Sequence, residues 1–348
     1  MDPLTHMLTG ACFGRAGFNR KTAYATLTML FAAEAADIDV LWDLKSPTAA
    51  LQHHRGITHS FVGVPFMAAA TLLGVYVLHR LWLRHRKPRP GYPPVRWNLL
   101  YGLALLAALS HLLLDYTTAY GIRLFEPFNY RWYSWDIMFI VEPVMSVVLL
   151  LGLALPSLFR LINREIGARD KGPGGRVGAT VALMLVVALW GYRDFQHRRA
   201  LSAMSAVTYN GVTATRIAAY PYVINPYRWH GVVETRDFFQ TLPVDSSKPE
   251  VDPHGEARTF YKPEETAVTQ AAKASYFGHV YLDWAVFPFV ETQNLAGDPK
   301  GYLVNFQDLR YAYPGRTALG GFVLLSPDLQ VEAQGSNSDR PRDLGGEK

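Results

Sequence analysis

The chain has almost no cysteine, since Cys12 is the single one among its 348 residues. One thiol excludes an intrachain disulfide and any zinc cluster built from cysteines. A metal ion would therefore have to be held by histidine and carboxylate side chains. The sequence also lacks a basic stretch before its first apolar run, because it opens with MDPLTH. This opening argues against an ordinary secretory signal peptide.

Charged residues are scarce as well. Asp, Glu, Lys and Arg make up 18% of the chain, against 49% hydrophobic residues, and the net charge is only +5. Most of the positive excess lies in short loops beside apolar segments, which is typical of membrane topology and not of nucleic-acid binding. We therefore expect a membrane protein with no nucleic-acid partner.

Long apolar windows are present only in the first 192 residues. A helix needs about 20 apolar residues to span a bilayer. Three windows meet this length, namely 61–83, 99–119 and 137–159, and a fourth, 177–192, is shorter. Two weaker windows near the start, 4–17 and 22–41, predict a helical hairpin. The pattern predicts about six hydrophobic helices.

The rest of the chain has short runs rich in Val, Phe and Tyr, bounded by Gly, Pro and Asn. Such runs predict β-strands. We therefore expect a polytopic α-helical membrane domain in residues 1–195, followed by a β-rich extramembrane domain of α+β type in residues 196–334. The polar end, residues 335–348, is expected to be disordered.

Basic residues set the expected orientation in the membrane. The linkers 84–96 and 160–176 are rich in Lys and Arg, as is the turn of the first hairpin. The positive-inside rule places all three in the cytoplasm. Both termini and the C-terminal domain of this multi-pass protein would then lie on the external face of the membrane, which is the periplasmic face if the membrane is a bacterial inner membrane. Arg193, Arg198 and Arg199 argue against this orientation, because they follow the last span on the outer side.

Ionisable side chains from distant parts of the chain fall near one face of the membrane in this topology. His111 and Asp115 are four residues apart within an apolar run, so they share one helix face, and such intramembrane groups are usually functional. The other candidates lie at the ends of apolar segments, where a lone His or Asp is more often a cap or an interfacial polar group. The expected metal ligands are His6, Asp37, Asp39, His54, His59, His111, Asp115 and Glu142.

Imidazole and carboxylate ligands without thiolate suit Zn²⁺, with Mn²⁺ as the alternative. The candidates outnumber the four ligands of a closed zinc site, which leaves room for a second ion or for groups that orient the ligands. A site with an open position would activate water near neutral pH. We expect Arg55 to bind an anionic oxygen of the substrate, and Asp39 or Asp115 to act as the catalytic carboxylate.

Four stretches, MDPLTH, AADIDVLW, HRGITHS and SHLLLDYTTAYG, occur in this order within residues 1–160. They resemble the YdjM-like family of membrane-bound metal-dependent hydrolases. The resemblance implies an inner-membrane enzyme related by its motifs to zinc-dependent phospholipases C and nucleases, so a phosphoester is the favoured bond. The residues that match the family's motifs are His6, Asp37, Asp39, His54, His59, His111 and Asp115.

We therefore expect a hydrolase that acts on a membrane lipid, a lipid-linked phosphoester or another small molecule. Residues 200–330 would be available to an envelope protein partner. Two alternatives stay open at this point. A transporter or channel would use the His and Asp residues as an ion or proton path, with ionisable groups spread across the membrane. A non-catalytic scaffold would hold a purely structural metal ion.

Overall fold

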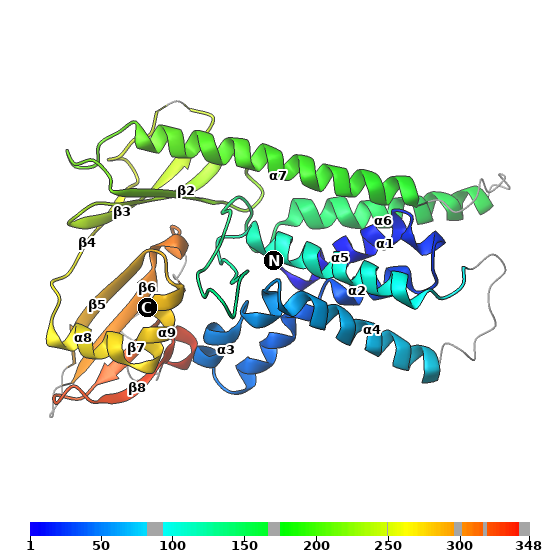
Figure 1. Cartoon of the computed structure of the whole chain (residues 1–348). Coiled ribbons are helices and arrows are strands. Elements are labelled where there is room, and N and C mark those ends of the chain that lie inside the picture. The colour runs from blue at the N-terminus through cyan, green and yellow to red at the C-terminus, as the bar shows by residue number, and fades with distance from the viewer. Residues whose placement is uncertain (82–92, 166–174, 249, 296–300, 316–318, 341–348) are drawn as a thin grey trace. The chain divides into compact units, whose positions relative to one another are not determined.

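The computed structural model describes residues 1–81, 93–165, 175–248, 250–295, 301–315 and 319–340, which form two compact units (Figure 1). The first unit consists of Met1–Asp39, Arg55–Phe195 and Val223–Asn225, and the second of Val40–His54, Gln196–Tyr222 and Pro226–Lys348. The main division falls at Phe195–Gln196. The sequence did not predict that residues 40–54 belong to the second unit.

The first unit is helical. Its helices are α1 (Pro3–Arg15), α2 (Ala25–Ala32), α4 (Gly63–Leu81), α5 (Trp97–Tyr116), α6 (Pro143–Glu165) and the larger part of α7 (Arg176–Ser205), with the short 3₁₀ turns η1 (Phe18–Arg20), η2 (Ala35–Leu44, its first half) and η3 (Ile57–His59). The DPLT sequence explains where α1 begins. Asp2 is the N-cap and accepts a hydrogen bond from the Thr5 amide at 3.0 Å, and Pro3 supplies a preset φ in the first turn.

Small residues let these helices approach closely. A Cβ atom on Gly14 of α1 would lie 2.5 Å from the Cα atom of Thr26 in α2. A Cβ atom on Gly152 of α6 would likewise lie 2.5 Å from the Ala182 side chain in α7. Glycine at such contacts is the usual way in which membrane helices pack backbone to backbone. The α1–α2 contact matters for function because it sets the position of the segment that follows α2.

Three of the described helices, α4, α5 and α7, are long and apolar enough to cross a membrane, and α6 adds a shorter apolar stretch, Pro143–Phe159. Helices α1 and α2 have 13 and 8 residues, fewer than the roughly 20 that a span takes. The described residues thus contain three candidate spans where the sequence predicts about six hydrophobic helices. The basic linkers 84–96 and 160–176 lie largely outside the described residues.

The second unit is rich in β-structure, as predicted. It holds two four-stranded antiparallel sheets, each with its strands in sequence order. The first contains β1 (Arg216–Pro221), β2 (Arg228–Glu234), β3 (Phe238–Asp245) and β4 (Arg258–Tyr261); the second contains β5 (Pro288–Asn294), β6 (Tyr302–Asp308), β7 (Gly320–Leu325) and β8 (Val331–Ser336). Helices α3 (Pro47–His53), α8 (Ala267–Ala274) and α9 (Tyr276–Trp284) complete the unit.

Apolar side chains of β2 and β3 pack against the C-terminal end of α7. This core includes Trp229, Val233, Leu242, Ala200 and Met204. In the second sheet, the stretch NFQDLRY at residues 305–311 contains a buried ion pair. Nε of Arg310 lies 2.8 Å from Oδ2 of Asp308. The guanidinium of Arg310 also donates to the carbonyl of Trp284 at 3.1 Å. Both charges are thereby compensated, as burial requires.

The expected disorder of residues 335–348 is wrong for the part that the structure describes. Strand β8 continues to Ser336, because Gly335 pairs with Phe322 of β7. A 3₁₀ turn, η6 (Asn337–Asp339), follows, and the carboxylate of Asp339 accepts a hydrogen bond from the Ser336 amide. Polar composition suggested disorder here, but edge pairing and a capping box order the segment. Residues 341–348 lie outside the described residues.

The buried His230 of β2 predicts a pH-dependent stability of the C-terminal domain. Its Nε2 atom donates to the carbonyl of Leu309 at 2.9 Å, and burial lowers the pKa of His230 to about 4. The unfolded chain binds this proton at pH about 6.5, so stability is full above that pH and falls between pH 6.5 and 4, by up to about 3 kcal/mol. Denaturant unfolding of the detergent-solubilised chain at several pH values, followed by tryptophan fluorescence, measures this loss.

His230→Gln keeps an N–H donor but removes the titration, and it is therefore expected to flatten the pH dependence. His254→Gln is the matched control, because His254 is exposed. An unchanged pH dependence in His230→Gln would contradict the assignment.

Candidate metal centre

The HRGITHS stretch, residues 54–60, forms a tight turn that points His59 into the protein. Arg55 adopts a left-handed φ of 58°, an unfavourable conformation for a non-glycine residue, and η3 follows it. The turn is held by the Arg55 amide, which donates to Oδ2 of Asp39 at 2.9 Å, and by the Arg55 carbonyl, which accepts from the Arg123 amide at 3.1 Å. The His59 side chain is fully buried as a result.

Helix α5 supplies two further side chains of the site. His111 and Asp115 lie one helical turn apart, and both are fully buried. Nδ1 of His111 lies 2.7 Å from the carbonyl oxygen of Ala33. A carbonyl can only accept, so the ring carries its proton on Nδ1 and presents the lone pair of Nε2 to the interior. A second hydrogen bond of this kind commonly orients metal-binding histidines.

Four ligand atoms converge at this place, one each from Asp37, His59, His111 and Asp115, and all lie within 4.8 Å of one another. The two Nε2 atoms of His59 and His111 are 3.0 Å apart. Oδ1 of Asp37 lies 3.1 Å from Nε2 of His59 and 3.6 Å from Nε2 of His111. Oδ2 of Asp115 lies 3.4 Å and 3.3 Å from the same two nitrogens.

These separations fit a divalent cation. Four ligands around a tetrahedral Zn²⁺ ion, with bonds of about 2.0–2.1 Å, lie about 3.3–3.4 Å from one another. The five separations given above, 3.0–3.6 Å, bracket this value. Nδ1 of His59 faces Oδ2 of Asp39 at 3.1 Å, so a proton on that nitrogen leaves Nε2 as a lone pair too. The cluster is then made of acceptors, which a cation would hold together.

His6 of α1 gives a second, independent sign of a metal ion. Its ring is fully buried and stacks on His111, with the centroids 3.8 Å apart. Neither ring nitrogen has a hydrogen-bond partner, and Nε2 lies 3.4 Å from Oδ1 of Asp115. Burial, followed by the charge of His111, lowers the pKa of His6 well below its usual range, so the ring is neutral. Buried polar atoms without partners are rare and often mark a bound ion or water.

Arg55 contacts the cluster from inside the protein. Its side chain is buried, and Nη2 donates to Oδ1 of Asp115 at 2.8 Å, while Nη1 donates to the hydroxyl of Thr118 at 3.0 Å. The amino group of Met1 also contacts Oδ1 of Asp115. These donors take one carboxylate oxygen and leave Oδ2 facing the imidazoles, without a hydrogen bond. Arg55 therefore positions Asp115, and its expected contact with an anionic substrate stays a prediction.

The two aspartates of the AADIDVLW stretch have different surroundings. Oδ2 of Asp39 accepts from the Arg55 amide and from the Thr58 hydroxyl, both within 3.0 Å, so this carboxylate holds the turn and the His59 ring. The Asp37 side chain is 20% exposed, whereas those of His59 and Asp115 are 0% exposed. Asp37 is thus the partly exposed member of the group.

One further candidate lies elsewhere. Glu142 is not part of the group, because its Oε2 atom accepts from Nη2 of Arg193 at 2.8 Å and both side chains are 1% exposed. Arg193, one of the three basic residues that argue against the expected orientation, is thus the buried partner of this acid. His54 caps the C-terminal end of α3 in the second unit, and its role as a ligand stays a prediction.

Glu34 is a residue that the sequence analysis missed. It follows α2, and its buried Oε2 atom has no hydrogen-bond partner. Burial, and after it the charge of Asp37, raises the pKa of Glu34 to about 7. The available signal was an acid within the apolar run FAAEAAD. Glu34 and Asp37 both line a pocket of about 440 Å³, together with Ala35, Ile38, Met67, Ala70 and Thr71.

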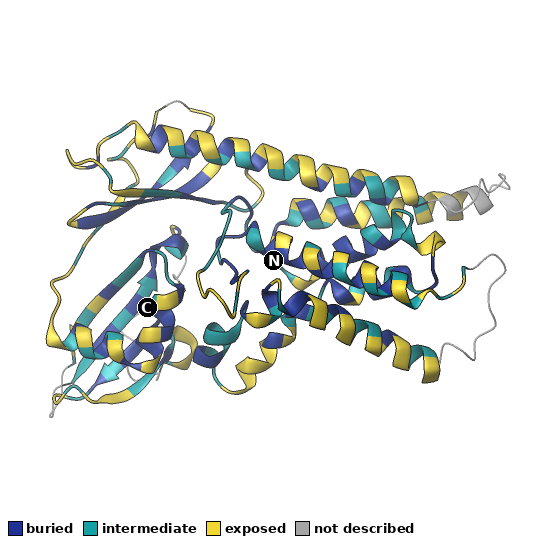
Figure 2. Ribbon diagram, in the orientation of Figure 1, coloured by how far each residue is buried: buried dark blue, intermediate teal, exposed yellow. Residues whose placement is uncertain are grey.

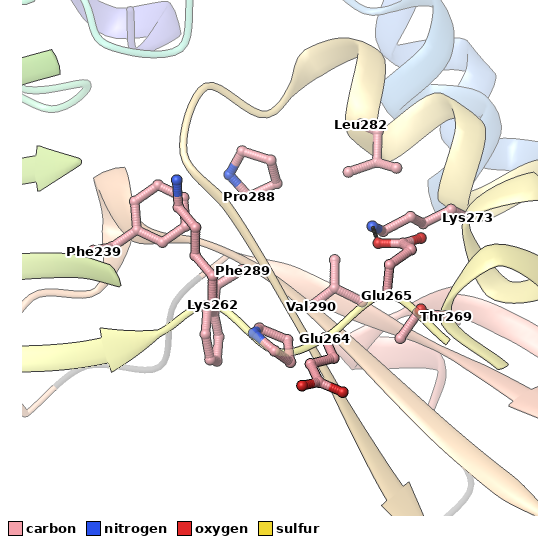
Figure 3. Close-up of a pocket in the computed structure, with 11 residues that line it drawn as sticks. Phe239, Lys262, Glu264, Glu265, Thr269, Lys273, Leu282, Pro288, Phe289 and Val290 are labelled. Atoms are coloured by element: carbon pink, nitrogen blue, oxygen red, sulfur yellow. Dashed lines mark hydrogen bonds and ion pairs between the residues drawn. The ribbon is translucent and has the colours of Figure 1, made fainter. Parts of the chain in front are cut away.

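The second unit has a pocket of its own, of about 290 Å³ (Figure 3). Its two lysines already have partners, since Lys273 pairs with Glu265 at 2.6 Å and Lys262 with Glu234 at 2.8 Å. Paired charges at a partly exposed surface give little reason to expect chemistry there. The histidine and aspartate cluster of the first unit is the better candidate site.

Loss of either central histidine should abolish metal binding. We expect the purified chain to carry zinc, and His59→Asn or His111→Asn to retain about a tenth or less, because each change removes a buried ligand. Elemental analysis by mass spectrometry after gel filtration in detergent measures this. His279→Asn, at an exposed histidine, is the control. Full zinc content in folded, monodisperse His59→Asn and His111→Asn would refute the site.

Comparison with known proteins places the chain in a family. A 163-residue region is 26% identical to the uncharacterised protein YfhP of Bacillus subtilis (strain 168) and covers 44% of this chain and 46% of that protein. The chain therefore matches about half the length of this relative. No solved structure matches the chain. The family model of the YdjM inner membrane protein matches residues 1–200, which include the whole cluster. The chain therefore belongs to the YdjM family of inner membrane proteins.

Proposed function

We propose that the protein is a membrane-bound, metal-dependent hydrolase that cleaves a phosphoester of a lipid or lipid-linked molecule. The observation that carries this proposal is the group of four converging ligand atoms, three from fully buried side chains and one from the partly exposed Asp37. A closed structural site would bury all its ligands. A partly exposed ligand beside a pocket gives a substrate access to the ion.

In this proposal, some residues of the chain would bind the metal ion and others would orient those ligands. His59, His111, Asp37 and Asp115 hold the ion, with Zn²⁺ favoured and Mn²⁺ as the alternative. When bound, the ion supplies a water molecule of lowered pKa and polarises the phosphoryl oxygen. Asp39 and the Ala33 carbonyl orient the two imidazoles, and Arg55 turns Asp115 toward the ion. This support keeps the ligands in a productive geometry before substrate binds.

The distribution of ionisable residues favours an enzyme over a transporter. No charged residue and no histidine occurs between Gly63 and Leu78 of α4, or between Asn98 and Ser110 of α5. An ion or proton path would require polar groups at several depths along such spans. The cluster residues instead lie near one end of each helix, with His59 before the start of α4 and with His111 and Asp115 near the end of α5, as a catalytic site at the membrane surface requires.

The same two helices support a site on the outer face. The cluster lies beside the start of α4 and near the end of α5, and the linker between these helices contains five basic residues and no acid within residues 84–96. The positive-inside rule places that linker in the cytoplasm, so the opposite ends of α4 and α5 face outward. Residues 200–330 would then be available to a partner protein of the envelope.

Removal of the metal ion should abolish hydrolysis. We expect the purified chain to cleave phospholipid and a generic phosphodiester, to lose at least about a hundredfold in rate after chelation, and to recover with added Zn²⁺. Asp37→Asn should cause a similar loss in a chain that stays folded, since Asp37 is partly exposed and its removal disturbs no core packing. Release of phosphate-containing product from both substrates is the measurement.

Glu291→Gln, at an exposed acid of β5, is the control variant. Hydrolysis that is indifferent to chelation would refute the proposal. Metal flux into liposomes without turnover would instead support the transporter.

A further inference from the structure

The pocket beside the metal centre has one apolar and one acidic part. Ile38, Met67 and Ala70 line the apolar part, and Glu34 and Asp37 provide the carboxylates. Its volume of about 440 Å³ lies within the roughly 300–1,000 Å³ of typical ligand pockets. The hydroxyl of Thr71 donates to the Met67 carbonyl at 2.9 Å, so this residue is satisfied within α4.

One wall of the pocket belongs to a helix that meets the bilayer. Met67, Ala70 and Thr71 follow a spacing of three and four residues, which places them on one side of α4. Only 22% of the apolar window of this candidate span is buried inside the protein. Figure 2 shows exposed residues along the length of α4. In a membrane the exposed face of α4 contacts lipid chains, so this wall of the pocket is continuous with the hydrocarbon region.

The other end of the pocket reaches the metal centre through a shared residue. Asp37 lines the pocket and also supplies one of the four ligand atoms. The pocket therefore joins the lipid-facing side of α4 to the cluster. A molecule that matches it has an apolar chain next to a phosphoester group, which is the chemistry of a phospholipid.

We infer that this pocket admits an acyl chain of a membrane phospholipid sideways from the bilayer and places the phosphodiester of that lipid beside Asp37. The inference rests on the proposed hydrolase activity for its catalytic meaning, but the binding of the chain does not require turnover. It makes long-chain phospholipid within the membrane the substrate class, in preference to a water-soluble phosphoester that arrives from the aqueous side.

A pair of adjacent alanines on α4 allows a matched test. Ala70 lines the pocket and Ala69 does not, although both are exposed on the same helix. Ala70→Phe fills the pocket with an aromatic ring, and Ala69→Phe adds the same ring about 100° further around the helix. We expect Ala70→Phe to lower kcat/KM for long-chain phospholipid in vesicles by about tenfold or more, because the pocket no longer takes the chain.

The loss in the cleavage of chain-free bis(4-nitrophenyl) phosphate should be much smaller, so that the ratio of the two kcat/KM values falls in Ala70→Phe, whereas Ala69→Phe should leave both activities unchanged. An equal loss on both substrates in Ala70→Phe, or no loss on either, would overturn the inference.

A measurement without turnover separates this inference from the proposed function. A phospholipid with a photoreactive group near the end of its acyl chain should cross-link to the peptide that contains Met67 and Ala70. Ala70→Phe should abolish this cross-link and Ala69→Phe should keep it. Cross-linking of this pattern in a chain without hydrolase activity would refute the hydrolase but support the lipid pocket. Equal labelling of wild type and Ala70→Phe would overturn the pocket whatever the activity.

Discussion

The candidate site depends on a fold that holds electron-rich atoms close together despite their mutual repulsion. Two imidazole nitrogens and two carboxylate oxygens meet within 4.8 Å in a largely buried place. A buried acceptor without a partner, such as Oδ2 of Asp115, costs about 1–3 kcal/mol, and a bound cation would compensate it. The chemistry of these ligand atoms therefore suits a cation site. The short glycine contacts of α1 and α2 and the strained turn at Arg55 both serve to bring these atoms together.

The surroundings of the cluster fix the direction of each ligand. The Ala33 carbonyl and the Asp39 carboxylate face the Nδ1 atoms of His111 and His59, and the Arg55 guanidinium holds one oxygen of Asp115. Asp37 alone among the four is partly exposed, and it faces a pocket whose other wall is part of a candidate membrane span. A rigid interior and one accessible ligand are what a hydrolytic centre at the edge of a membrane needs.

Local patterns in the sequence predicted a large part of this arrangement. The four-residue spacing of His111 and Asp115 indicated one helix face, and the Val- and Phe-rich runs indicated the β-rich domain, because both signals depend on near neighbours in the chain. Family membership was visible for the same reason, from motifs of a few residues. The structure then showed His59 and His111 in contact, although 52 residues separate them.

Long-range pairing could not be predicted in the same way. Glu142 resembled a ligand until its partner, 51 residues away, proved to be Arg193. The pairing of Arg55 with Asp115, 60 residues away, was equally hidden from local patterns. The short α1 and α2 helices and the ordered residues 335–340 depend on tertiary packing and edge pairing, which amino-acid composition does not reveal.

X-ray absorption spectroscopy of the zinc-loaded chain tests the central claim, that two histidines and two aspartates hold a metal ion, most directly. The account predicts about four nitrogen and oxygen neighbours at about 2.0–2.1 Å, with the scattering signature of two imidazoles. A shell of oxygen atoms alone, without imidazole, would contradict it.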